Sequence, residues 1–257
     1  MPGWHDATRK LQEDGKLQMV GIIQEQHPDR ARLFMQWKGM EWPILVDSLN
    51  LLGVSSVPIT LEIDEYGVIR KVHPPLAEAD RIEAEFVNRE FTKPAGSGAA
   101  PVAHPDLNEL RTATGAGTVA AWRTFADALV LWEGPDRLGE AIGAYRQALG
   151  KNPEDGPTRF RLGVGYRKRY DSDFRQTDDL RMAVVNWQAA LDIDPNQYIW
   201  RRRIQQYGPR LDKPYPFYDW VTSAREEIRK RGEFPAALRV EPGGAEFAHP
   251  LREFPIA

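Results

Sequence analysis

The side chains that most enzymes use for covalent or metal chemistry are sparse in this sequence. None of the 257 residues is a cysteine, which excludes disulfides, thiolate metal sites and cysteine nucleophiles within this chain. The five histidines lack the paired helical spacing that holds zinc. No nucleophile stands where His27 or His73 could serve it as a base, so both are expected in loops. We predict no catalytic residue, no metal site and no cofactor.

Arginine and lysine offer a different chemistry. Residues 156–213 hold twelve basic side chains against seven acidic ones, in a chain of net charge −3. Their densest runs are Arg167, Lys168, Arg169 and Arg201, Arg202, Arg203. One interpretation is a basic surface that recruits an acidic peptide or a C-terminal carboxylate. The other is that these side chains solvate helix faces and pair with nearby acids, namely Asp171, Asp173, Asp178 and Asp179.

Composition limits the class of partner. With 42% hydrophobic and 28% charged residues, the chain is typical of soluble globular proteins of one or two domains. Its charge shows no bias toward nucleic acid or anionic membranes, and no apolar run is long enough to span a bilayer. We expect a protein or peptide partner, no nucleic acid and no membrane. The compartment is left open, with the cytoplasm as the default because no signal-peptide core is present.

Residues 42–71 have the clearest local pattern. An apolar run ends at Asp47, a short helical pattern follows, and Val57-Pro58 precedes an alternating strand at 59–63. The turn Asp64-Glu65-Tyr66-Gly67 then leads into a second short strand. In such a turn the aspartate caps the backbone and the glycine adopts positive φ. This pattern predicts a β-hairpin.

These features resemble the second half of a thioredoxin-like redoxin domain, the family that includes thioredoxins and peroxiredoxins. The matching features, in order, are Gly53-Val54, Val57-Pro58, Ile63-Asp64 and Gly67-Val68-Ile69. The resemblance extends from about Met1 through a helix near residues 78–91, roughly a third of the chain. It implies a cis Val57–Pro58 bond. Since the equivalent loop touches substrate backbone in relatives, Val57 and Pro58 are either a leftover peptide-docking edge or scaffold.

The resemblance also implies that the central strand and the redox cysteines of the family are missing from this chain. In the family, the redox cysteines follow a central strand, and residues 1–14 resemble the later part of the helix after them. The absent strand would lie between the strands expected at 17–23 and 59–63, leaving unpaired backbone groups on both. The two strands could close up directly, residues 236–240 could fill the gap, or the chain is a fragment of a longer product. We expect the third, through a misassigned start or a selenocysteine codon read as a stop.

The second half has another pattern. Residues 93–118 are rich in Gly, Ala and Pro and read as a linker, in which only residues 107–110 are apolar enough to dock. From residue 119 the spacing resembles two tetratricopeptide (TPR) repeats, the second carrying an eight-residue insertion around 171–178. The first repeat is marked by Trp122, Phe125, Ala128, Trp132, Ala141, Tyr145, Ala148 and Pro153. The second is marked by Leu162, Gly163, Tyr166, Ala183, Trp187, Ala190 and Pro195.

The C-terminal quarter is expected to close the repeats. A degenerate helix pair near residues 198–207 and 217–231 would cap the apolar face. The tail, residues 232–257, is either disordered or an extended strap held by its aromatic rings.

The predicted fold class is therefore α/β plus all-α: an incomplete thioredoxin-like sheet (1–92), a linker (93–118), a TPR-type helical module (119–231) and an extended tail (232–257). The predicted function is that of a non-catalytic interaction module that binds a protein partner, with self-association through the unpaired strands as a further expectation. The alternative is a fragment of a thiol- or selenol-dependent redoxin whose repeats recruit a client. The residues expected to bind the partner are Val57, Pro58, Arg167, Lys168, Arg201, Arg202 and Arg203.

Overall fold

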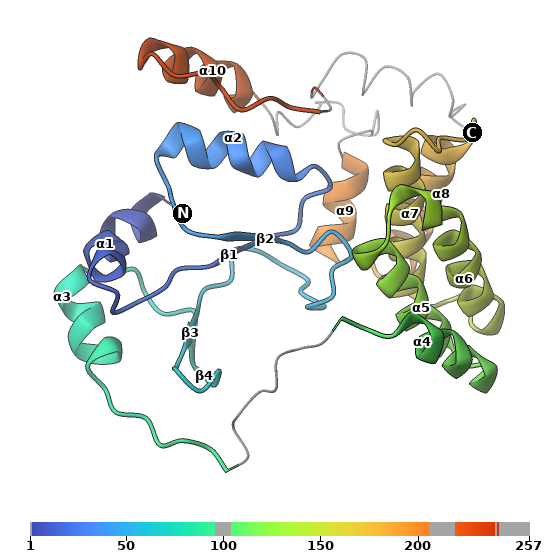
Figure 1. The fold of residues 1–257 in the computed structure, drawn as a ribbon, viewed down its shortest axis with the longest axis horizontal. Coiled ribbons are helices and arrows are strands. Elements are labelled where there is room, and N and C mark those ends of the chain that lie inside the picture. Colours follow the sequence, from blue (N-terminus) through green and yellow to red (C-terminus); the bar gives the residue numbers. More distant parts are fainter. Residues whose placement is uncertain (1, 96–103, 206–218, 240, 242–257) are drawn as a thin grey trace. The chain divides into compact units, whose positions relative to one another are not determined.

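The computed structural model describes residues 2–95, 104–205, 219–239 and 241 (Figure 1). The chain divides into two compact units, an α/β unit with small sheets and a helical unit. The first unit comprises Met1–Val46, Ser56–Val102 and Val221–Leu238. The second comprises Asp47–Ser55, Ala103–Trp220 and Arg239–Ala257. The mixed fold class agrees with the prediction. Residues 47–55 fall in the second unit and residues 221–238 in the first.

Two separate two-stranded ladders form the sheets of the first unit. Strand β1 pairs with β2 in parallel, with Gly21 opposite Ile44, and β3 pairs with β4 antiparallel, with Leu61 opposite Val72. A helix connects β1 to β2, as a parallel pair requires. The elements of this unit are α1 (Pro2–Glu13), β1 (Gly21–Ile23), α2 (Pro28–Lys38), β2 (Ile44–Val46), β3 (Leu61–Ile63), β4 (Ile69–Val72), α3 (Ala79–Ile82) with a π-helical turn (Glu83–Val87), and α10 (Trp220–Lys230).

The predicted hairpin is confirmed in detail. Asp64 Oδ1 accepts the backbone N–H groups of Tyr66 and Val68, each at 2.9 Å. Gly67 adopts a φ of 78°, which glycine takes without steric cost. Arg70 Nε donates to the other carboxylate oxygen of Asp64 at 2.6 Å. The Val57–Pro58 bond is cis, as the resemblance implies.

Direct closure of the sheet across the missing strand, one of the three expected outcomes, is wrong, because β1 and β3 lie in different ladders. Residues 236–239 form no strand, and residue 240 lies outside the described residues. Apolar side chains of the two ladders and their flanks are 37–56% exposed. They are Val20, Ile22, Leu45, Val46, Val57, Ile59, Leu61, Ile63, Ile69, Val72 and Leu76. The ladders thus lack a covering layer among the described residues.

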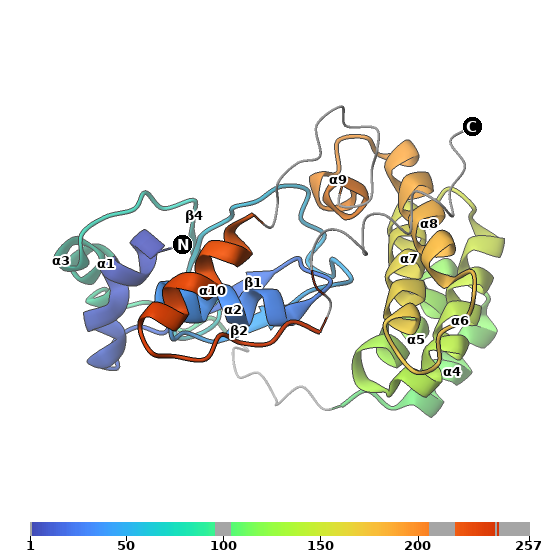
Figure 2. The ribbon, with the colours of Figure 1, turned by 90° about the horizontal axis from the view of Figure 1, so that it is seen from above.

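Helix α10 corrects the expectation of a third helix pair. It belongs to the first unit instead of pairing with the helices of the second (Figure 2). Trp37 Nε1 on α2 donates to the Glu227 carboxylate at 2.7 Å, and Arg231 donates to the backbone carbonyls of Gln36 and Trp37. The contacts of α10 therefore go to α2, and Val221, Ala224 and Ile228 are buried. Residues 206–218, 240 and 242–257 lie outside the described residues.

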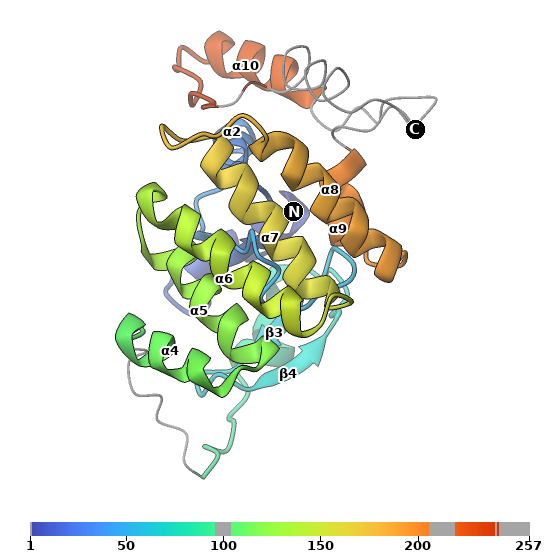
Figure 3. The same ribbon diagram turned by 90° about the vertical axis from the view of Figure 1, so that its right-hand side faces the viewer.

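The helical unit is built from successive helices joined by short loops (Figure 3). Alanines, aromatics and branched aliphatic side chains fill its core. Leu107 and Leu110 pack against this core, which confirms that this part of the linker docks. The helices are α4 (Leu107–Ala113), α5 (Val119–Trp132), α6 (Leu138–Lys151), α7 (Gly156–Tyr170), α8 (Asp179–Ile193) and α9 (Tyr198–Gln205).

Side-chain caps explain several of the helix starts. Asp106, Thr118 and Asp155 accept backbone N–H groups in the first turns of α4, α5 and α7. Such a cap satisfies amide groups that have no partner within the helix. The residues predicted to form an insertion, 171–178, lie between the end of α7 at Tyr170 and the start of α8 at Asp179. By contrast, Asp29 does not cap α2, because His27 occupies the N-cap position and Asp29 lies in the first turn.

Gly163 allows helices α7 and α8 to approach each other closely. A Cβ at this position would lie 2.5 Å from the Trp187 ring and 2.9 Å from the Ala183 carbonyl oxygen. Trp187 and Ala183 are both fully buried, so neither can move aside into open space. The two helices therefore approach each other over a glycine, with the tryptophan as the filling group.

Gly163→Ala is expected to destabilise the helical unit by roughly 1–3 kcal/mol, because overpacking outweighs the gain in helix propensity. Gly143→Ala is the matched control. It lies on an exposed face of α6 with nothing within 4 Å of the added Cβ, and we expect stabilisation of up to about 1 kcal/mol. Urea denaturation followed by circular dichroism measures both. Equal effects of the two substitutions would contradict the close approach of α7 and α8.

Candidate functional site

Residues Asp47–Ser55, here called the docked segment, belong to the helical unit although they are flanked by residues of the first unit. The segment is a self-capped turn and not the short helix that the sequence suggests. The Asp47 carboxylate accepts the backbone N–H groups of Leu51 at 2.7 Å and Leu52 at 3.1 Å. The Asn50 side chain bonds both the N–H and the carbonyl of Val54. These bonds fix the shape of the segment from within.

One leucine anchors the docked segment. Leu49 is 0% exposed and lies in the core cluster of the helical unit. Leu51 and Leu52, by contrast, are 47% and 59% exposed. Full burial of a leucine side chain is worth roughly 2 kcal/mol, so most of the apolar contribution of this segment comes from a single side chain.

Groups on the helices bind the backbone of the docked segment. Arg161 Nε on α7 donates to the Leu49 carbonyl at 3.1 Å, and Arg203 Nη2 on α9 donates to the Ser48 carbonyl at 3.3 Å. The Tyr198 backbone N–H, at the start of α9, donates to the Ser55 carbonyl at 3.1 Å. Backbone carbonyls are common to every peptide, so these three contacts impose little sequence preference. Specificity here falls on the leucine pocket.

A buried acid orients Arg161. Its Nη1 donates to Asp127 Oδ2 on α5 at 2.5 Å, while Tyr145 OH on α6 donates to Asp127 Oδ1 at 2.6 Å. Burial raises the pKa of the Asp127 carboxyl, although Arg161, Tyr145 and Arg123 lower it in part. Burial, and then Asp127, raise the pKa of Tyr145 well above its ordinary value. Tyr145 therefore stays a donor, and three helices combine to aim one guanidinium at the segment.

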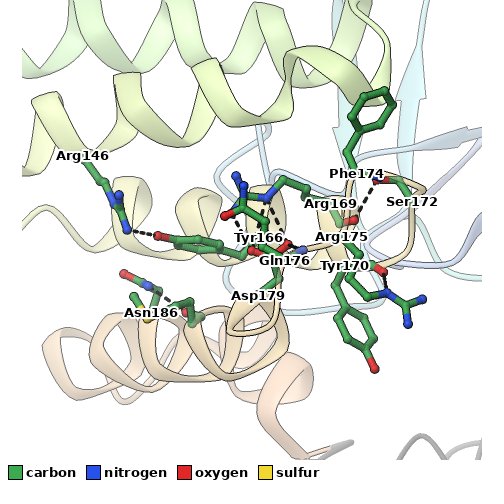
Figure 4. Close-up of polar contacts among 11 residues, drawn as sticks. Arg146, Tyr166, Arg169, Tyr170, Ser172, Phe174, Arg175, Gln176, Asp179 and Asn186 are labelled. Carbon is green, nitrogen blue, oxygen red and sulfur yellow. Dashed lines mark hydrogen bonds and ion pairs between the residues drawn. The ribbon is translucent and has the colours of Figure 1, made fainter.

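The arginines of the first predicted run are engaged internally. Arg167 is 1% exposed and its Nε donates to Asp171 at 2.9 Å. Arg169, also buried, donates to Asp179 at 2.6 Å and to Gln176 (Figure 4). For these two side chains the interpretation as paired arginines is confirmed. Their charges are not displayed at the surface of the helical unit.

The other predicted residues do not form one surface with them. Lys168 is half-buried, and burial together with the charge of Arg203 lowers its pKa. Arg203 is 2% exposed and faces the docked segment. Arg201 is exposed and donates to the Pro195 carbonyl, and Arg202 is half-buried. Val57 and Pro58 are exposed in the first unit. The structure thus brings Arg203 alone of the seven to the docked segment.

A pocket of about 400 Å³ lies beside the docked segment. The segment supplies Leu49, Asn50 and Gly53 to its lining. The helices and their loops supply Asn152, Glu154, Asp155, Gly156, Pro157, Phe160, Arg161, Ile193, Asp194, Gln197 and Trp200. Volumes of this size suit a side chain or small ligand. The pocket lies wholly within the helical unit.

Metal sites, histidines and membrane-spanning helices were the other features to consider among the described residues. Among the described residues, no cluster of three or more His, Asp or Glu could hold a metal ion. His73 lies in an exposed loop, and His27, at the N-cap of α2, is buried. No helix within the described ranges is long and apolar enough to cross a membrane.

Sequence reasoning missed the residues that hold the docked segment. Asp127 is the only acid in the mainly apolar helix at 119–132, and a lone acid in such a helix signals a buried partner. The segment reads DSLNLLGVS, with more leucine than an exposed loop between two strands needs. Both signals were present, but neither says which helix receives the leucine.

Comparison with protein-family models, with curated proteins and with solved structures finds no match for this chain. The function is therefore inferred from the geometry of the docked segment and of the residues that hold it.

Leu49→Ala is expected to destabilise the helical unit by about 2–5 kcal/mol, because it leaves a cavity in a packed core. Leu52→Ala, three residues away and largely exposed, should change stability by about 0.5 kcal/mol at most. Hydrogen exchange at the amides of α7 and α9 reports the difference, with limited proteolysis within residues 47–55 as a second measurement. If the two variants exchange and cleave alike, Leu49 is not an anchor.

Proposed function

We propose that this chain is a non-catalytic protein-interaction module, in which a thioredoxin-like α/β unit without its redox strand is joined to a TPR-type helical unit that binds a peptide segment of a partner. The absence of cysteine removes the family's own chemistry from the chain. Recognition is then the function that the remaining geometry can serve.

The thioredoxin-like part of the proposal is supported by strand order. A parallel pair with a helical crossover is followed by an antiparallel hairpin and then by a helix, α3. The hairpin carries the Asp64 turn that the resemblance implies. The two ladders are separate, which is compatible with one more strand between β1 and β3.

Packing at the repeat positions supports the TPR-like part. Most of the residues that the repeat keeps small or aromatic are buried in the helical unit, with the exceptions of Trp132, which is 54% exposed, and Trp122, which is half-buried. In the first repeat the buried residues include Ala128, Ala141, Tyr145 and Ala148, and in the second Gly163, Ala183, Trp187 and Ala190. Helices paired in this way leave a surface that peptides can occupy.

The observation that carries the proposal is the docked segment itself. It is a non-helical stretch held by one buried leucine and by donors aimed at three of its carbonyl oxygens. A partner peptide with a leucine in the same position would find the same pocket and the same donors. The chain's own segment competes for these contacts at a high effective concentration, because it is covalently attached.

A labelled peptide with the sequence of residues 47–55 tests this mode of binding by fluorescence anisotropy. We expect weak binding to the wild-type chain and at least tenfold tighter binding to the Leu49→Ala chain, whose own segment has lost its anchor. The same peptide carrying Leu49→Ala should not bind, whereas the peptide carrying Leu51→Ala should bind normally. Arg161→Gln in the full chain should abolish binding.

The Asp47→Ala chain provides a second receptor in case Leu49→Ala impairs folding. It removes the bonds to Leu51 and Leu52 that shape the segment and leaves the helices unaltered. Circular dichroism confirms that each variant is folded. Folded variants that ignore the peptide at millimolar concentration would overturn the proposal.

A second candidate function is a thiol- or selenol-dependent redoxin that recruits a client through its repeats. The observation that favours it is the pair of separate two-stranded ladders, since one more central strand bearing the redox group could pair with the free edges of both. Coding sequence upstream that contains an in-frame strand followed by a cysteine or UGA codon would favour this candidate. The 257 residues alone should show no thiol-reductase or peroxidase activity under either proposal.

Until such a strand is supplied, we expect the open ladders to cause self-association, since exposed strand edges pair with one another. Sedimentation velocity should show a mass that increases with concentration. The double variant Ile22→Lys, Ile63→Lys should remain monomeric, because charge on an edge opposes pairing. Leu131→Lys, which changes an exposed leucine of the helical unit, is the control and should associate like the wild type. A wild-type mass independent of concentration would contradict this expectation.

A further inference from the structure

We propose that the pocket beside the docked segment receives a basic side chain, arginine or lysine, of the partner peptide. The inference rests on the proposed function and gives the partner its chemistry. It reverses the expectation drawn from the arginine runs, which pointed to an acidic partner.

The first step is the charge of the pocket lining. Three carboxylates, Glu154, Asp155 and Asp194, face one guanidinium, Arg161. Asp155 already pairs with Arg123 at 2.8 Å. Although burial works against it, the bonds from Thr158 and the charge of Arg123 lower the pKa of Asp155. This carboxylate is thus ionised and largely satisfied.

The other two carboxylates are not neutralised. Asp194 accepts a single bond, from the backbone N–H of Asn196 at 3.1 Å, and neither it nor Glu154 forms an ion pair within the part of the chain that the structure describes. The only cation of the lining, Arg161, is already paired with Asp127 and also donates to the Leu49 carbonyl. The pocket therefore presents uncompensated negative charge to whatever enters it.

Two aromatic side chains form part of the pocket lining. Phe160 and Trp200 lie nearly parallel, with ring centroids 5.8 Å apart and an interplanar angle of 19°. They give the pocket an apolar surface along which the methylene stem of lysine or arginine can lie. Arginine adds a planar head group that stacks on aromatic rings. A lining whose acids outnumber its one cation, next to an aromatic wall, is the chemistry that selects a long cationic side chain over a hydrophobic one.

A third observation indicates that the ligand is part of a peptide. Trp200 is 5% exposed, and its indole Nε1–H, a donor with no acceptor function, has no partner among the described residues. Buried donors are rarely left unpaired. Because Trp200 lines the pocket, we assign the missing acceptor to an amide carbonyl next to the basic side chain. One basic residue of a peptide thus offers both a cation for Glu154 and Asp194 and an oxygen for Trp200.

The test uses the full chain and N-acetyl-arginine N-methylamide, with the citrulline analogue as a neutral control of the same shape. The indole N–H resonance of Trp200, assigned with Trp200→Phe, follows binding by NMR. We expect a saturable shift with a dissociation constant on the order of 1 mM, and at least tenfold weaker binding of the citrulline analogue. The lysine counterpart should bind within about tenfold of arginine, since both carry the charge.

Charge variants locate the effect. Glu154→Gln with Asp194→Asn should weaken the arginine probe at least tenfold. Asp192→Asn, an exposed acid on α8 outside the pocket lining, is the matched control and should leave binding unchanged. Equal binding of arginine and citrulline, or no shift of the Trp200 resonance at tens of millimolar, would overturn the inference. If the peptide of residues 47–55 binds while the arginine probe does not, only this inference fails; if neither binds, the proposed function fails as well.

Discussion

The contact between Asp127 and Arg161 is the interaction on which the rest of the candidate site depends. Arg161 has one donor for the acid and another for the Leu49 carbonyl, so a single side chain joins the interior of the helices to the docked segment. Tyr145 occupies the other oxygen of Asp127. A buried ion pair of this kind adds little net stability, but loss of one partner is costly because the other charge remains buried. Its contribution here is geometric: it fixes the direction in which the guanidinium points.

The same division between internal and displayed charge explains why the basic residues give a misleading picture of the partner. Arg167, Arg169 and Arg203 contribute much of the local positive charge, yet all three are buried against acceptors supplied by the chain itself. Acids of the α6–α7 and α8–α9 loops, Glu154 and Asp194, remain open at the pocket instead. Residues 156–213 therefore carry a net positive charge in the sequence, whereas the lining of the pocket carries more acids than bases.

Local features could be predicted from the sequence, and long-range ones could not. The Asp64 turn, the small residue at 163, the start of the helices at residue 119 and the break at 171–178 follow from patterns within a few residues of each other, where turn chemistry and helical spacing decide the outcome. The destination of Leu49 depends on a cavity formed by residues more than seventy positions later, and no spacing rule encodes such a match. The position of helix α10 could not be predicted for the same reason. Its amphipathic pattern would suit any apolar partner, and only the contacts with Trp37 and Gln36 determine that it packs on α2.

The route of the docked segment has a consequence for dissecting the protein. Because the segment leaves the first unit after β2 and returns to it before β3, the helical unit is assembled from pieces that are distant in the chain. A fragment starting after residue 118 would retain helices α5 to α9. It would lack Leu49, so its core would contain a cavity the size of one leucine side chain. Arg161 and Arg203 would also lose the carbonyl acceptors that the docked segment supplies. Cutting the chain at its linker would not separate two self-sufficient halves, so complementation of the helical fragment requires a piece that contains residues 47–55.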